Sequence, residues 1–236
     1  MNQGWGWLVL SPVMIVVLAF FLVSQPASQG ALTHVVTDKK VVAITFDDGP
    51  SPKYTPLILK TLSQYHAYGT FFVVGSEVKR FPGLVKDIAR QGSAIADHGW
   101  SHLNLRRVGA QALWNDAAKT AQYVQSLGVP VVPFYRPPYG MVSTALLKTF
   151  GEHGYTVVLW SIDTRDWARP GIGSIINKVA TQVKPGSIIL LHDGGGNRSQ
   201  TVAALNAILE QLTQMGYKMV TLPTLVKEHH NAPKAI

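Results

Sequence analysis

Residues 41–50 read VVAITFDDGP, and this stretch indicates both a fold and a site. Val41–Phe46 is short, rich in β-branched residues and ended by turn residues, which predicts a fully buried strand. Asp47 and Asp48 follow this strand directly. Adjacent residues of an extended chain point to opposite sides, so the two carboxylates are expected to differ in role, one as a metal ligand and the other as a base. An ordinary Asp-Asp-Gly-Pro turn is the alternative, because these are common turn residues.

Strand-like and helix-like segments alternate along the rest of the chain. The expected strands are Val41–Phe46, Thr70–Gly75, Ser93–His98, Val131–Arg136, Tyr155–Asp163, Ser187–Asp193 and Lys218–Leu222. The expected helices are Thr55–Tyr65, Pro82–Gln91, Ala110–Leu127, Ser143–His153, Ile172–Val183 and Thr201–Met215. The alternation predicts an α/β fold with a parallel sheet of about seven strands and crossover helices. An open doubly wound sheet and a closed or nearly closed barrel both fit.

Reactive residues occur at the ends of several expected strands. In both architectures the active site lies at the carboxyl ends of the strands. The residues at such ends are Asp47 and Asp48, His98, Arg136, Asp163 to Asp166, and His192. One shared site explains these positions better than several unrelated occurrences of such residues at strand ends.

Composition limits the classes of function. The chain has 236 residues, of which 47% are hydrophobic and 14% charged, so it can bury a substantial core. A net charge of +8 suggests an anionic environment, such as nucleic acid, anionic lipid or an acidic cell wall. The basic residues are dispersed, which argues against nucleic acid as a partner. The absence of cysteine excludes disulfides, thiolate metal sites and a cysteine nucleophile.

The amino-terminal segment differs from the rest. Residues 7–23 form a continuous apolar run, WLVLSPVMIVVLAFFLV, and no charged side chain precedes Asp38. The run is longer than a signal-peptide core and close to the roughly 20 residues that a spanning helix needs. We therefore expect a signal peptide or membrane anchor with its linker in residues 1–30, and a catalytic domain in residues 34–230. Lys39 and Lys40, which follow the run, slightly disfavour export of the domain.

A metal site is predicted from two histidines and one aspartate. His98 and His102 lie in the sequence HGWSH, and their spacing places both imidazoles on one face if the segment is a helical turn. Together with Asp48 they offer two nitrogens and one oxygen. This is the three-ligand set with an open position that is typical of catalytic zinc or of another divalent ion.

Two further strand ends supply groups for acid–base chemistry. Arg136, in YRPPYG, is expected to pair with Asp47 and keep it ionised, while the backbone N–H of Tyr139 faces a developing oxyanion. His192 ends the run LLH, and a neighbouring carboxylate would hold it in the protonated form that a general acid needs. Asp166 is the expected partner of His192, with Asp163 as the alternative.

These residues fall in five ordered motifs: TFDDGP at 45–50, HGWSH at 98–102, RPPY at 136–139, DTRDW at 163–167 and LLH at 190–192. The set resembles the polysaccharide deacetylases of carbohydrate esterase family four, and the resemblance covers Val41 to Pro223. It implies a distorted, incomplete (β/α) barrel. The chain departs from the family pattern at Gly99, where Ser or Thr is usual, and at Leu103, where Pro is usual.

The resemblance also implies a role for each site residue. Asp47 is the base, and Asp48, His98 and His102 are the ligands of a divalent metal, expected to be Zn²⁺, with Co²⁺ or Mn²⁺ as alternatives. Arg136 positions Asp47, His192 is the acid, and Asp166 supports His192. Trp167 and Leu190 form the walls of the pocket for the acetyl methyl group.

The implied activity is removal of acetyl groups from an N-acetylated polysaccharide, with N-acetylglucosamine residues of peptidoglycan or a chitin-like polymer as the expected substrate. The bond hydrolysed is a linear amide, a carbon–nitrogen bond other than a peptide bond. Such polymers lie outside the membrane, which favours an extracytoplasmic enzyme, secreted or anchored, and its basic charge would retain it at an anionic wall or membrane. The alternatives are a non-catalytic glycan-binding member of the fold and an amidohydrolase acting on small cyclic amides or imides.

Overall fold

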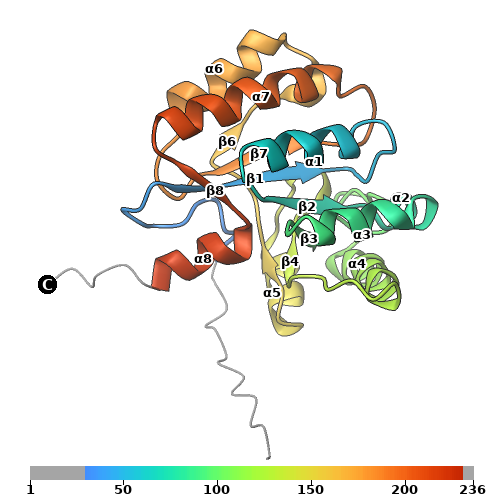
Figure 1. Ribbon diagram of the computed structural model, residues 1–236. Helices are drawn as coiled ribbons and strands as arrows, with labels where there is room; N and C mark the ends of the chain where they lie inside the picture. Colours follow the sequence, from blue (N-terminus) through green and yellow to red (C-terminus); the bar gives the residue numbers. More distant parts are fainter. Residues whose placement is uncertain (1–29, 231–236) are drawn as a thin grey trace, which may run out of the picture.

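The structure is a computed structural model that describes residues 30–230 (Figure 1). The apolar run at residues 7–23, expected to be a signal peptide or anchor, lies outside the described residues. Among the helices of residues 30–230, none has both the length and the apolar character needed to cross a bilayer.

The centre of the fold is a curled eight-stranded sheet in which every strand pair is parallel. The strand order is β5-β4-β3-β2-β1-β7-β6, and β8 pairs with β1. The strands are β1 (Val41–Asp47), β2 (Gly69–Val73), β3 (Ala94–Asp97), β4 (Phe134–Tyr135), β5 (Thr156–Val157), β6 (Ile162–Asp163), β7 (Ile188–His192) and β8 (Lys218–Val220). Because β5 and β6 stand at the two ends of this order, the barrel is incomplete.

Helices surround the sheet, with α1, α6 and α7 above it in Figure 1 and α2 to α5 to the right and below. The helices are α1 (Thr55–Gln64), α2 (Gly75–Arg80), α3 (Pro82–Arg90), α4 (Ala110–Ser126), α5 (Thr144–Glu152), α6 (Ile172–Gln182), α7 (Ser199–Gln214) and α8 (Leu222–His230). Two short 3₁₀ turns, η1 (Pro138–Gly140) and η2 (Asp166–Ala168), follow β4 and β6. Leu222 and Leu225 of α8 pack with the first residues of β1 in one apolar cluster, so α8 covers the end of the barrel at which β1 begins.

Strand β1 is buried along its whole length, as the apolar run predicts. Successive side chains of a strand point to opposite faces. Val42, Ile44 and Phe46 accordingly pack in the cluster that includes α1 and α7, while Val41 and Ala43 belong to the cluster inside the barrel. Asp47 continues the inner series, and its side chain therefore points into the mouth of the barrel.

The predicted fold class, a distorted and incomplete (β/α) barrel of parallel strands, is confirmed. Among the predicted strands, Tyr155–Asp163 is two short strands, β5 and β6, rather than one. The chain leaves the sheet at Val158–Ser161 because β5 pairs with β4 and β6 pairs with β7, on opposite sides of the open seam. The strand predicted at Val131–Arg136 is limited to Phe134–Tyr135, and the one predicted at Lys218–Leu222 ends at Val220. The short helix α2 and the last helix, α8, were not predicted.

Candidate active site

The predicted site residues lie together at the carboxyl ends of β1, β3, β4, β6 and β7. The strand register accounts for this, because Asp47 is the direct neighbour of His192 across β1 and β7. Asp97, the last residue of β3, pairs with Tyr135 of β4, so His98 and Arg136 leave the sheet side by side. Parallel pairing thus brings together residues that are up to 145 positions apart in the sequence, Asp47 and His192.

Asp47 and Arg136 form a buried ion pair. The guanidinium Nη1 lies 2.7 Å from Asp47 Oδ1 and also donates to the hydroxyl of Thr45 at 2.8 Å, while Nη2 donates to the carbonyl of Leu159 at 2.9 Å. The Arg136 side chain is wholly buried and stacks over the ring of Phe72. Burial lowers the pKa of Arg136, and Asp47 opposes that shift by stabilising the charged form. The predicted contact between these two residues is present.

Asp48 departs from the strand direction and faces two histidines. Its φ of 71° places it in the left-handed region, and its Oδ1 lies 3.4 Å from His98 Nε2 and 3.2 Å from His102 Nε2. Burial acts to raise the pKa of Asp48, but the hydrogen bonds of His102 and His98 and the charges of His98 and His192 outweigh burial and hold the pKa well below its usual range. This carboxylate is therefore ionised at neutral pH, as a metal ligand must be.

The segment between the two histidines is a loop, not the helical turn considered from the sequence. Gly99 and His102 have positive φ values of 81° and 52°, which reverse the chain and bring the imidazoles to a ring separation of 5.0 Å. The predicted proximity of His98 and His102 is correct, but its structural cause is this reversal rather than helical spacing.

The donor atoms of Asp48, His98 and His102 fit a divalent metal ion. They all lie within 4.8 Å of one another, and they combine two imidazole nitrogens with one carboxylate oxygen, a set suited to Zn²⁺ and similar ions. His98 Nδ1 lies 2.7 Å from the carbonyl oxygen of Arg136 and donates to it. In the neutral ring, the proton on Nδ1 leaves the lone pair of Nε2 directed at the cluster, which is the usual arrangement behind a metal-binding histidine.

His192 is paired with Asp166 rather than with Asp163. Its Nδ1 lies 2.7 Å from Asp166 Oδ1, and its backbone N–H donates to Asp166 Oδ2 at 2.9 Å. Thr201 also donates to Asp166 Oδ2, whereas Asp163 Oδ1 accepts the N–H of Arg165. Burial acts to lower the pKa of His192, but the hydrogen bond and charge of Asp166 outweigh it, so the pKa is raised. The imidazolium therefore persists to higher pH than that of an ordinary histidine.

The three predicted pocket residues have different surroundings. Tyr139 is 61% exposed, has a positive φ of 62° in turn η1, and places its ring 4.9 Å from that of His102. Trp167, in η2, is 48% exposed and lies beside Arg165. Leu190 is buried in β7, where it pairs with Thr45 of β1. The oxyanion and pocket-wall roles of these residues stay predictions.

Sequence reasoning missed the loop that follows His192. Asp193 is fully buried and accepts a hydrogen bond from the Thr55 hydroxyl at 2.5 Å. Burial raises the pKa of Asp193 to about 7; Thr55 opposes the shift, and the charges of Asp48 and Asp47 add to it. Arg198 donates to the carbonyls of Gly194 and Gly195, and a Cβ at Gly195 would collide with the Asp48 carboxylate. The glycine run at 194–196 was the available signal, because close backbone approach requires glycine.

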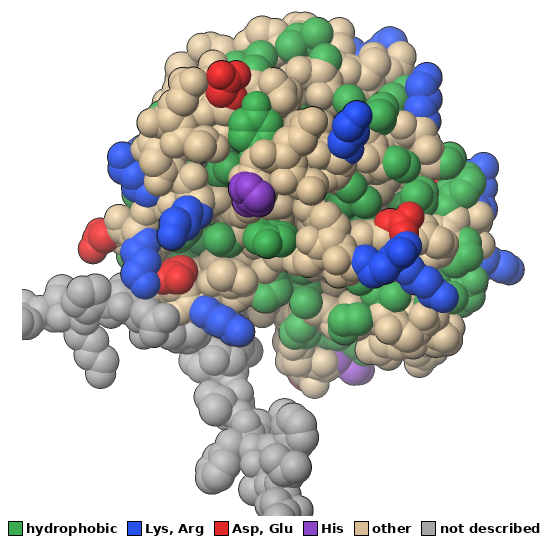
Figure 2. Space-filling model, viewed as in Figure 1, with side chains coloured by type: hydrophobic (Ala, Val, Ile, Leu, Met, Phe, Trp, Pro, Cys, Tyr) green, Lys and Arg blue, Asp and Glu red, His purple; other side chains and the backbone are tan. Residues whose placement is uncertain are grey.

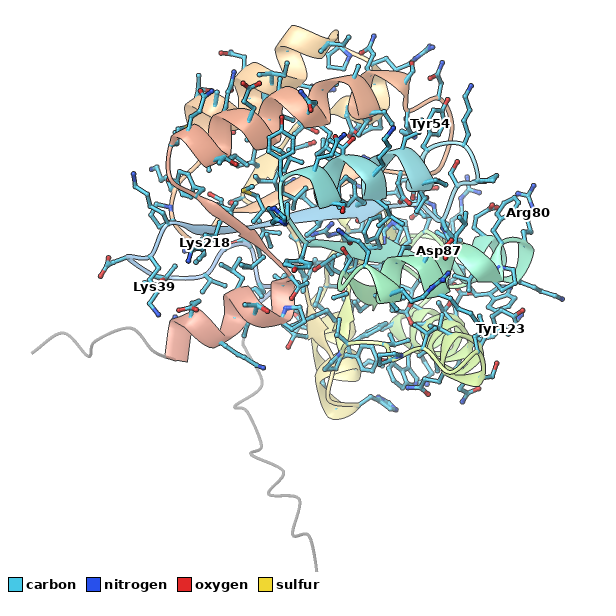
Figure 3. The ribbon with its side chains drawn as sticks, in the orientation of Figure 1. Lys39, Tyr54, Arg80, Asp87, Tyr123 and Lys218 are labelled. Atoms are coloured by element: carbon cyan, nitrogen blue, oxygen red, sulfur yellow. The ribbon has the colours of Figure 1, made fainter. Side chains whose placement is uncertain are left out.

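An open hollow of about 320 Å³ adjoins Asp48. Its walls come from three segments: Pro50 to Pro52, the residues Glu77, Arg80 and Phe81, and Gly194 to Gly196. Arg80 pairs with Glu77 there, and Figure 3 shows Arg80 at the outer end of α2. The hollow is thus lined by charged groups, an aromatic ring and glycine backbone, directly beside Asp48.

Comparison with known proteins decides the family. A family model described as polysaccharide deacetylase matches residues 34–158, which are 125 of the 236 residues. The chain is 45% identical over 199 residues to a peptidoglycan-N-acetylglucosamine deacetylase of Bacillus cereus, with 84% of this chain and 93% of that protein covered. The chain belongs to the polysaccharide deacetylase family.

Other polysaccharide deacetylases match over most of their length. A chitooligosaccharide deacetylase of Bradyrhizobium is 34% identical over 202 residues, covering 80% of this chain and 92% of that protein. The crystal structure of a peptidoglycan N-acetylglucosamine deacetylase in complex with 4-naphthalen-1-yl-N-oxidanyl-benzamide superimposes with a TM-score of 0.80 at 36% identity, covering 87% of this chain and 95% of that one. The family resemblance drawn from the five motifs is confirmed.

Proposed function

We propose that this polysaccharide deacetylase is a metal-dependent N-deacetylase acting on N-acetylglucosamine residues of peptidoglycan or a chitin-like polymer. The observation that carries the proposal is the position of three groups at one edge of the sheet: the Asp47–Arg136 pair, the Asp48, His98 and His102 set, and the His192–Asp166 pair. The substrate class is supported by the relatives, which are named for peptidoglycan and chitooligosaccharide.

Asp48, His98 and His102 would hold the metal, with Zn²⁺ as the proposed ion. When bound, such an ion supplies Lewis-acid chemistry, acidifying water and polarising a carbonyl group. The carbonyl of Arg136 fixes His98 for this task by accepting its Nδ1 proton. The same residue, through its side chain, holds Asp47, so one residue aligns both the ligand and the base.

The proton transfers follow from the two ion pairs. Asp47, held in place by Arg136, accepts a proton from the attacking water while the water oxygen bonds to the acetyl carbon. His192 engages Asp166 through Nδ1, which leaves the Nε2 proton free for the sugar nitrogen as the carbon–nitrogen bond breaks. The products are acetate and a free amine, and the Tyr139 N–H is the proposed donor to the oxyanion. No covalent acyl-enzyme is required.

A polymer outside the membrane makes an extracytoplasmic location part of the proposal. The apolar segment at residues 7–23 would export or anchor the domain. Figure 2 shows Lys and Arg side chains spread over the visible face, with a few acidic ones among them. Such a surface suits loose retention at an anionic wall rather than one specific anionic ligand. The hollow beside Asp48 is the proposed place for a neighbouring sugar of the polymer.

The direct test is acetate release by the purified domain with added divalent metal, measured in parallel on peptidoglycan, chitin oligomers and acetylated xylan. The proposal predicts release from one of the N-acetylglucosamine polymers and none from xylan. Saccharide binding without release by the metal-loaded protein would support the non-catalytic alternative. Hydrolysis confined to small cyclic amides or imides would support the amidohydrolase alternative.

The ligand set has its own test in His98→Ala. This change should abolish activity and reduce bound zinc to well below one equivalent, because one of three ligands is removed. Elemental analysis of the purified variant measures the metal. Full zinc content in His98→Ala would remove His98 from the set.

A further inference from the structure

The loop between the two metal-binding histidines has its backbone held from two sides. The carbonyl of Gly99 accepts the N–H of Gly75 at 2.9 Å, and the carbonyl of Trp100 accepts that of Ser76 at 3.1 Å. Gly75 and Ser76 are the first residues of α2, whose N–H groups lack partners within their own helix. The carbonyl side of the loop is thus docked on the start of α2.

The N–H side of the same loop is held by a carboxylate on α4. Asp116 Oδ2 accepts the N–H of Trp100 at 2.7 Å and that of Ser101 at 2.9 Å. The remaining N–H, from Gly99, goes to Asp97 Oδ1 at 2.7 Å. Every N–H between His98 and His102 therefore has an acidic acceptor, and two of the three depend on a single oxygen of Asp116.

Helix α4 also contacts the Trp100 side chain of the loop. The ammonium of Lys119 lies 4.0 Å from the centre of the Trp100 ring, and the ring of Tyr123 meets the same tryptophan edge-on at 5.5 Å. Asp116, Lys119 and Tyr123 are spaced by three and four residues, which places them on one face of the helix. Figure 3 shows Tyr123 on α4. One helical face thus contacts both the backbone and the ring of the loop.

Gly99 is matched to this arrangement. Its φ of 81° favours glycine, and a Cβ there would lie 2.8 Å from Asp116 Oδ2, closer than carbon and oxygen pack. The departure from the family pattern at Gly99 therefore leaves room for the carboxylate that binds the next two N–H groups. Residue 99 and residue 116 act as a pair.

We propose that Asp116 is a positioning residue for the metal site. It fixes the reversed loop of residues 98–102, so that His98 and His102 meet Asp48 before metal arrives. Hydrogen bonds to a charged acceptor are roughly twice as strong as neutral ones, and a loop ordered in advance avoids the entropy cost of ordering it during binding. The inference rests on the proposed metal set, and neither the five motifs nor the ligand set includes Asp116.

The test is calorimetric titration of zinc into metal-free protein. Asp116→Ala should weaken zinc binding about 10- to 100-fold, the usual cost of losing a group that orients ligands. Asp116→Asn should stay within about threefold of wild type, because one amide oxygen can accept both N–H groups, although without charge. Asp87→Ala is the matched control, since Asp87 is a helical carboxylate paired with Arg90 at the surface, and its zinc affinity should equal that of wild type.

The outcomes separate this inference from the proposed function. No zinc binding by wild type would contradict the ligand set itself. Wild-type affinity in folded Asp116→Ala would overturn the role of Asp116 alone, as would an Asn variant that binds zinc as weakly as the Ala variant.

A second measurement does not depend on the folding of Asp116→Ala. Gly99→Ala should weaken zinc binding in the wild-type background, and it should cost less when combined with Asp116→Asn, whose neutral amide can move away more easily. Coupling of this kind is expected only for residues in contact. An equal loss in both backgrounds would contradict the pairing of Gly99 with Asp116.

Discussion

Two carboxylate–cation pairs flank the ligand set, and their geometry is nearly the same. Asp47 meets Arg136 at 2.7 Å, and Asp166 meets His192 at 2.7 Å. Both carboxylates are almost fully buried, with side-chain exposures of 5% and 0%. The pairs differ in the cation: one is a guanidinium and the other an imidazole. Distance and burial therefore do not distinguish the two halves of the site, but the proton chemistry of the cation does.

In the proposed mechanism, the identity of the cation sets the direction of proton transfer. A guanidinium does not lose its proton in proteins, so Arg136 stays charged beside Asp47, the proposed base. An imidazolium loses its proton near neutral pH, so His192 can give one away, and Asp166 sets the pH at which it does so. The proposed base and the proposed acid thus end neighbouring strands, β1 and β7, and differ in the partner of each pair.

The largest expected effect comes from removing the permanent cation. Arg136→Ala leaves Asp47 buried without its partner, which costs about 3–5 kcal/mol of unfolding free energy. Acetate release should fall to background as well, because Asp47 is no longer held as an aligned anion. Denaturant unfolding and the acetate assay measure the two effects. A variant with wild-type stability would show that the pair contributes little to holding the strand ends together.

The next effect is on turnover alone. Asp47→Asn keeps the side-chain shape but removes the base, so turnover should fall about 100-fold or more while zinc stays bound. Asp48→Asn is the matched variant one residue away, and it should lose zinc. Zinc analysis of both proteins checks this division of labour. Loss of metal from Asp47→Asn, with retention in Asp48→Asn, would mean that the two roles are exchanged.

The smallest effect is expected at a surface pair. Arg90 and Asp87 form an ion pair on α3, with side-chain exposures of 75% and 43%. Exposed pairs of this kind contribute roughly 0–1 kcal/mol, so Arg90→Ala should change the unfolding free energy by less than about 1 kcal/mol and leave turnover unchanged. A loss as large as that of Arg136→Ala would contradict burial as the cause of the difference.

Much of the architecture could be predicted because it depends on local patterns. The buried run Val41–Phe46 is β1 apart from one residue, and Gly92, Gly128, Gly154 and Gly216 follow helices with positive φ, the conformation that glycine commonly adopts just after a helix. The missed helix α2 has only six residues and begins Gly-Ser, too short for an apolar period to be read. Leu222, predicted as the end of a strand, instead begins α8.

The motifs predicted which side chains gather at the site but not what holds them. Asp47, Asp48, His98, Arg136 and His192 follow apolar runs, and parallel pairing then forces them together. Asp116 and Arg198 lie within or beside helices and act on backbone groups distant in sequence. Such contacts depend on how loops fold back, as in the reversed loop at residues 98–102. Residue order does not reveal this geometry.

The central claim is that Asp166 makes His192 the acid, and the pH–rate profile of Asp166→Asn tests it most directly. Because Asp166 raises the pKa of His192, its loss should let the imidazolium deprotonate sooner and move the alkaline limb to lower pH. Asp163→Asn is the matched control and should leave that limb in place, since Asp163 engages only the Arg165 N–H. An unmoved limb in Asp166→Asn, together with a shifted one in Asp163→Asn, would contradict the account.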